Sequence, residues 1–134
     1  MSGMEFSNDG KITPPDTVVE VRDFQHYNEL LEKYARRLII VNFWSPSCPH
    51  CLNFMPIFMA AQQYYKKNIV FLKLNIMSPA GYIAQRVGVE GVPTILFGVG
   101  NTLIYKQIGA PNGPQFKELI ERVIAYIKSQ QVAE

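Results

Sequence analysis

Two cysteines are the residues of this 134-residue chain best suited to chemistry: Cys48 and Cys51, in the run Cys-Pro-His-Cys. They are the only cysteines, they stand three positions apart, and they directly follow an apolar run. In a helix, positions i and i+3 lie one turn apart with Cα atoms roughly 5 Å from each other, which suits a disulfide. The pair can therefore open and close with little backbone movement. A C-x-x-C motif beside alternating strands and helices is typical of thiol–disulfide redox chemistry.

The positions of the two cysteines predict different roles for them. The thiolate is the reactive form, so function depends on lowering a cysteine pKa from its free value of about 8.5. Cys48 is expected at the start of a helix, where unpaired backbone amides and the helix dipole stabilise negative charge. We therefore expect Cys48 to attack. Cys51, one turn deeper and covered, is expected to resolve the mixed disulfide by intramolecular attack.

The two residues between the cysteines fit this chemistry. His50 can donate a hydrogen bond, or a positive charge when protonated, to the Cys48 sulfur, and stabilising the thiolate makes the disulfide a stronger oxidant. The alternative is that His50 is an ordinary surface histidine at a helix start. Pro49 is expected in the first helical turn, where its missing amide proton costs nothing.

Composition narrows the class of protein. Apolar residues make up 48% of the chain and charged residues 18%, which fits one globular domain with a full core. The formal charge is only +2 and the basic pairs Arg36-Arg37 and Lys66-Lys67 are short, so nucleic acid is not expected as a partner. No apolar run reaches about eighteen residues, and residues 1–15 do not resemble a signal peptide. We therefore expect a cytoplasmic protein with no membrane partner.

The elements that must position the motif can be read from hydrophobic periodicity. We expect a flexible leader over residues 1–15 and a single domain over residues 16–131. The order of elements is strand, helix, strand, helix, strand, helix, two strands and a final helix, which predicts an α/β fold with a mixed central sheet of about five strands and helices on both faces. The expected strands are 17–21, 38–43, 69–75, 94–99 and 103–108, and the expected helices are 24–34, 51–67 with a kink at Pro56, 80–87 closed by Gly88, and one with an apolar stripe from Phe116 to Ile127.

Several motifs stand in order and at compatible spacing along the chain: residues 43–51, Pro56, residues 71–75, residues 91–94 and residues 108–110. Together they resemble the thioredoxin family, and the resemblance runs from about residue 18 to residue 127. It implies the thioredoxin fold, protein-disulfide oxidoreductase activity without a bound cofactor, and a reducing partner such as a thioredoxin reductase.

The resemblance also implies a substrate-binding surface beside Cys48. It predicts a cis Val92-Pro93 peptide bond packed against the disulfide, with the backbone of Val92 pairing with an extended substrate segment. The surrounding apolar surface would come from Trp44, Gly91, Gly109 and Ala110. The alternative for Trp44 is ordinary core packing, and the two roles can coexist.

The chain departs from the family pattern at several tuning positions. Ser47 stands where typical thioredoxins have a tryptophan, and the Pro-His pair is instead similar to that of the DsbA-type oxidases, although the chain has no room for their helical insertion. Asn42 replaces a buried aspartate that relays a proton for the second cysteine. Lys73 matches the lysine that partners this aspartate. Its charge would be unpaired and its pKa depressed, or its head would reach water.

Three functions remain open at this point. The leading one is a thioredoxin-like protein disulfide reductase, and the second is a disulfide-forming or isomerising protein of more oxidising potential. The third is a non-enzymatic binding module with a structural disulfide. Metal capture by Cys48, Cys51 and His50 is disfavoured, because a structural zinc site takes four ligands and the only other histidine, His26, is far away in the sequence.

Overall fold

The computed structural model describes residues 12–132. The elements follow one another in the predicted order, with two helices starting away from their predicted bounds. They are β1 (Val19–Glu20), α1 (Phe24–Lys33), β2 (Leu38–Trp44), α2 (Pro49–Tyr65), β3 (Ile69–Asn75), α3 (Ile83–Arg86), β4 (Thr94–Val99), β5 (Thr102–Ile108) and α4 (Gly113–Val132).

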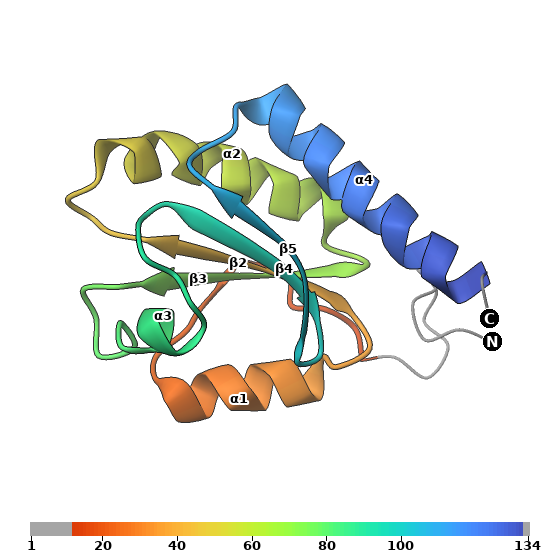
Figure 1. The fold of residues 1–134 in the computed structure, drawn as a ribbon, viewed down its shortest axis with the longest axis horizontal. Helices are drawn as coiled ribbons and strands as arrows, with labels where there is room; N and C mark the ends of the chain where they lie inside the picture. Colours follow the sequence, from red (N-terminus) through yellow and green to blue (C-terminus); the bar gives the residue numbers. More distant parts are fainter. Residues whose placement is uncertain (1–11, 133–134) are drawn as a thin grey trace.

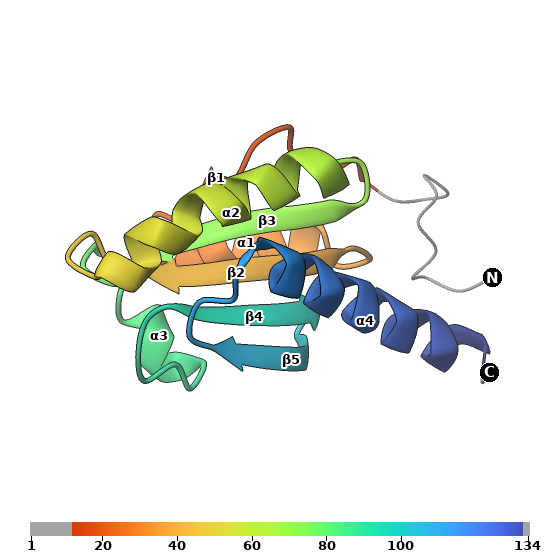
Figure 2. The same cartoon turned by 90° about the horizontal axis from the view of Figure 1, so that it is seen from above.

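The strands form one five-stranded mixed sheet in the order β1-β3-β2-β4-β5. β1, β3 and β2 are parallel, whereas β4 runs antiparallel to β2 and β5 antiparallel to β4. Helices α1 and α3 lie on one face of the sheet, and α2 and α4 lie on the other (Figure 1). Figure 2 looks onto this second face and shows α2 and α4 in front of the strands. This architecture confirms the predicted α/β fold.

The sheet separates two hydrophobic cores. Along β2, Leu38 and Ile40 pack on the side of α2 and α4, while Ile39 and Val41 pack on the side of α1 and α3. A strand buried on both faces needs apolar residues at every position, which explains the continuous apolar run in the sequence. The polar exception is Asn42, which is fully buried and shares the face of Leu38 and Ile40.

The ends of the helices follow from local hydrogen bonds. Asp23 caps α1, since its carboxylate accepts from the backbone amide of His26 at 2.8 Å. α3 is shorter than the predicted 80–87, because residues 75–81 form successive turns in which the amide of Ser78 donates to Asn75 and that of Gly81 to Ser78. α2 starts at Pro49, earlier than the predicted 51–67, and continues through Pro56.

The limits of the domain are not decided by the fold. Most of the expected leader, residues 1–11, lies outside the described residues, so its flexibility and the domain limits at 16 and 131 stay predictions. Within residues 12–132, no helix has both the length and the hydropathy that a bilayer-spanning segment requires.

Replacing Phe58 with alanine should lower the free energy of unfolding by about 3–5 kcal/mol. Phe58 is fully buried, and its ring lies 5.4 Å from that of Phe71 and 5.9 Å from that of Phe54. Met59, the next residue of α2, is 41% exposed, so Met59→Ala is a matched control that should cost less than about 1 kcal/mol. Urea denaturation measures both variants, and equal losses would contradict this assignment of the core.

Candidate active site

The two cysteines lie where β2 passes through a short loop into α2 (Figure 1). They form a disulfide with their Cα atoms 5.2 Å apart, as the i, i+3 spacing predicted. Cys51 is fully buried, and Cys48 is partly exposed. An incoming sulfur can therefore reach Cys48 but not Cys51.

Cys48 is the N-cap residue of α2. Its backbone is extended, with φ −107° and ψ 108°, and its sulfur accepts a hydrogen bond of 3.1 Å from the amide of Cys51. The sulfur thus occupies the place that a serine or aspartate oxygen usually takes at a helix start. Pro49 occupies the first turn, as predicted. In the reduced protein, this amide and the helix dipole would stabilise a thiolate on Cys48.

A serine turn that the sequence analysis did not single out shapes the loop before Cys48. Ser45 is nearly buried, and its hydroxyl accepts from the amide of Ser47 at 3.2 Å and lies 3.0 Å from the Ser47 hydroxyl. The carbonyl of Ser45 accepts from the amide of Cys48 at 3.2 Å. The sequence does contain a signal for this turn, because a Ser-Pro pair such as Ser45-Pro46 favours a turn.

The loop before β4 closes the other side of the site. The Val92-Pro93 peptide bond is cis, in agreement with the expectation, and the Val92 carbonyl oxygen lies 3.8 Å from the Cys48 sulfur. Gly109 donates its amide to the Pro93 carbonyl at 2.9 Å, with a φ of +88° that favours glycine. The hydroxyl of Thr94, which belongs to the 91–94 motif but was given no role, donates to the Gly91 carbonyl at 2.7 Å.

These contacts bring together sequence-predicted site residues from three segments: Cys48, Val92, Pro93 and Gly109. Gly91 and Ala110 are both exposed next to them in the chain.

The tuning residues are arranged around the end of β2. Asn42 lies opposite Lys73 in the β2–β3 register, but the Lys73 ammonium sits over the ring of Trp44, 5.7 Å from its centroid. The amide nitrogen of Asn42 is 3.9 Å from the Met55 sulfur, and its side-chain oxygen has no hydrogen-bond partner among the described residues. Met55 was not foreseen, although it lies four residues after Cys51 and thus on the same face of α2.

His50 is exposed, and within residues 12–132 it makes no hydrogen bond to either cysteine sulfur. Its proposed effect on Cys48 therefore depends on charge and proximity rather than on a contact in the oxidised form. In the described part of the chain, no group of three or more His, Cys, Asp or Glu side chains is placed to hold a metal ion.

A model of the thioredoxin family matches residues 17–123. The chain therefore belongs to the thioredoxin family, and its CxxC pair is close enough to form a disulfide. Among its relatives, the thioredoxin H-type of Brassica oleracea is 28% identical over 125 residues, which cover 92% of this chain and 94% of that protein.

Another relative, glutaredoxin-3 of Mus musculus, is 27% identical over 108 residues, or 81% of this chain. The chain spans only 31% of the length of that glutaredoxin and 30% of the one from Bos taurus. The crystal structure of Malassezia sympodialis thioredoxin superposes with a TM-score of 0.72 at 19% identity, covering 84% of this chain and 96% of that one. This last likeness shows a shared fold.

Proposed function

We propose that the chain is a thiol–disulfide oxidoreductase that reduces protein disulfides through Cys48 and Cys51. The observation that carries this proposal is the unequal placement of the two sulfurs. Cys48 is partly exposed at the helix start and accepts an amide hydrogen bond, whereas Cys51 is fully buried beside it. No bound cofactor is needed, because the two thiols themselves carry the two electrons.

The reaction runs in two exchanges. The Cys48 thiolate attacks one sulfur of a substrate disulfide, the substrate S–S bond breaks, and the displaced sulfur leaves as a thiolate that takes a proton from solvent. Cys51 then loses its proton and attacks the Cys48 sulfur, which releases the second substrate thiolate. The substrate gains two electrons, and the chain is left with its Cys48–Cys51 disulfide.

We propose that the loop before β4 forms part of the substrate-binding site. The Val92 carbonyl oxygen lies 3.8 Å from the Cys48 sulfur. We propose that the Val92 backbone pairs with an extended segment of the substrate. Trp44, Gly91, Pro93, Gly109 and Ala110 would form the surrounding surface. Gly91 is exposed, and Trp44 and Gly109 are partly exposed, which leaves room for the segment to approach closely.

A reducing partner must return the Cys48–Cys51 disulfide to the dithiol, and we propose that this partner is a thioredoxin reductase. We also propose a cytoplasmic location, because a reducing compartment would keep the pair in its active dithiol form. Fractionation of cells that express the tagged chain tests the location.

The direct test of the activity is reduction of insulin by dithiothreitol. The protein should accelerate precipitation of the insulin B chain well above the rate with dithiothreitol alone. No acceleration would favour the third function, a binding module in which the Cys48–Cys51 disulfide is only structural.

A second candidate function, disulfide formation or isomerisation, is favoured by His50 and by the absence of a carboxylate at position 42. The two directions differ in reduction potential, which runs from about −270 mV for thioredoxin to about −120 mV for DsbA. Equilibration with glutathione measures the potential of this chain. A reduction potential near that of DsbA would favour disulfide formation over disulfide reduction as the function of the chain.

Replacing His50 with alanine should raise the pKa of Cys48 and lower the reduction potential by about 10–30 mV. The sign follows because a positive charge near Cys48 stabilises the thiolate, and thus the reduced form, so its removal favours the disulfide. His26→Ala, a change of the distant histidine on α1, is the matched control. Thiolate absorbance against pH and the glutathione equilibrium check both effects, and an unchanged titration would exclude this role for His50.

A further inference from the structure

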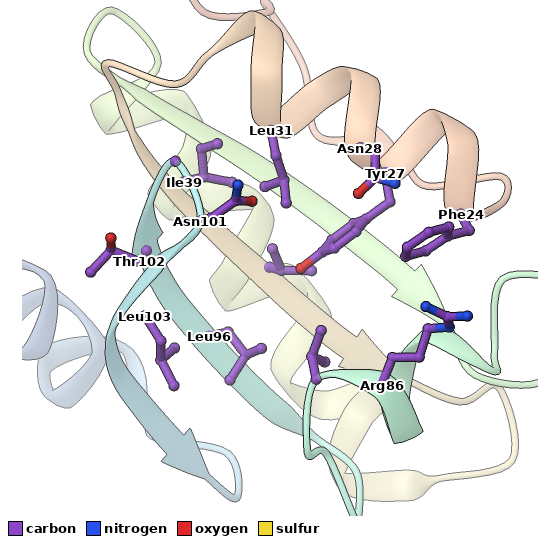
Figure 3. Close-up of a pocket in the computed structure, with 14 residues that line it drawn as sticks. Phe24, Tyr27, Asn28, Leu31, Ile39, Arg86, Leu96, Asn101, Thr102 and Leu103 are labelled. Carbon is purple, nitrogen blue, oxygen red and sulfur yellow. The ribbon is translucent and has the colours of Figure 1, made fainter.

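A cavity of about 410 Å³ lies on the face of the sheet that carries α1 and α3 (Figure 3). Neither cysteine lines it, and neither do Val92 and Pro93. Its volume is in the range of small-molecule sites, about 300–1,000 Å³. The cavity is therefore a separate feature from the redox site.

The local sequence explains why this part of the sheet is hollow. α3 has only four residues, so it covers little of β4 and β5 on this face. Gly98 and Gly100 line the cavity without side chains. A Cβ at Gly98 would approach the backbone oxygen of Thr102 to 2.9 Å, so the register shift between β4 and β5 keeps glycine there.

The hydroxyl of a largely buried tyrosine points into this space. Tyr27 of α1 is only 7% exposed, and Figure 3 shows its hydroxyl reaching away from the helix and over the sheet. This hydroxyl has no hydrogen-bond partner among the described residues. Burial raises the pKa of Tyr27, so the group is a neutral donor. A ligand in the cavity that carries an acceptor atom would give this hydroxyl a hydrogen-bond partner.

One end of the cavity carries a positive charge. The guanidinium of Arg86 lies 4.6 Å from the centroid of the Phe24 ring. In Figure 3, the Phe24 ring lies beside Tyr27. Within the described part of the chain, no acidic residue lines the cavity and Arg86 has no ion pair with a carboxylate. The other lining residues are mostly apolar, among them Leu31, Leu96 and Leu103.

We propose that this cavity binds a small amphipathic monoanion, an apolar body with one carboxylate. The apolar body would lie between α1 and the β4–β5 half of the sheet, the carboxylate would pair with Arg86, and Tyr27 would donate to an oxygen of the ligand. The proposal does not depend on the redox function, since the two sites share no residue.

The test is a titration of the full chain with octanoate and, separately, with octan-1-ol, followed by NMR. Octanoate should bind saturably and more tightly than octan-1-ol. The largest changes in NMR chemical shift should occur at Tyr27, Leu96 and Leu103. Arg86→Gln should weaken octanoate binding about fivefold and leave octan-1-ol binding unchanged. Arg122→Gln, an exposed arginine on α4 outside the cavity, is the matched control and should change neither affinity.

Tyr27→Phe separates a binding role from a structural one. Because the hydroxyl has no partner within residues 12–132, its removal should not lower the thermal midpoint, yet it should weaken octanoate binding about threefold. Equal affinities for octanoate and octan-1-ol, or no effect of Arg86→Gln, would overturn the proposal. Shift changes that gather around Trp44 and Val92 would also overturn it, because the probe would then occupy the redox surface.

Discussion

Cys48→Ser should lose disulfide reductase activity by at least about a thousandfold, since the variant has no thiolate with which to open a substrate disulfide. The buried Cys51 cannot take its place, because none of its surface is exposed to an incoming sulfur. Insulin reduction with dithiothreitol measures the loss. Substantial activity in this variant would show that Cys51 is reachable and would contradict the assigned roles.

Cys51→Ser is the matched variant and should fail differently. Cys48 can still attack, but nothing resolves the product, so mixed disulfides with client proteins should accumulate. Non-reducing electrophoresis of a lysate that contains the tagged variant detects these adducts, and dithiothreitol should release them. The double variant Cys48→Ser/Cys51→Ser should trap nothing. Equal trapping by Cys48→Ser would reverse the order of the two cysteines.

Asn42→Asp should accelerate the resolving step about tenfold at neutral pH. The asparagine side chain is fully buried and cannot accept the Cys51 proton, whereas a carboxylate there could. The Asn42 side chain faces α2, where it contacts Met55, one turn beyond Cys51. Lys73, its neighbour across the β2–β3 pair, could then move from the Trp44 ring to pair with the new charge.

Stopped-flow release of a thiol from a preformed Cys48 mixed disulfide isolates this step. Asn42→Leu is the control, because it keeps the size of the side chain without a titratable group, and its rate should equal that of the unchanged protein. If Asn42→Asp were no faster than Asn42→Leu, the missing carboxylate would not limit resolution.

The long buried strands could be predicted from the sequence because nearly all of their buried positions are apolar. The first strand was predicted over 17–21, but β1 is only Val19–Glu20. β3 has the predicted bounds of 69–75, and β2 extends the predicted run by one residue, to Trp44. The third helix was predicted too long because its turn residues, Ser78 and Gly81, form hydrogen bonds that compete with helix formation.

The site was predicted only in part, because local spacing can be read from the sequence and the packing of distant elements cannot. The i, i+3 spacing determines the Cys48–Cys51 geometry locally, so it could be read directly. The contact of Asn42 with Met55 and the hollow beneath Tyr27 depend on how distant elements pack, and no periodicity in the sequence records that. The position of Tyr27 in the wall of this hollow, together with Gly98 from a distant strand, likewise appears only in the structure.

The central claim is that one sulfur of the reduced pair is ionised and reachable while the other is not. Alkylation of the reduced protein by iodoacetamide over a range of pH, with each cysteine followed by peptide mass spectrometry, tests it most directly. We predict that Cys48 reacts at least about tenfold faster than Cys51 at neutral pH, with a midpoint below the free-thiol value of about 8.5. Equal, slow alkylation of both cysteines, with no midpoint below that value, would contradict the account.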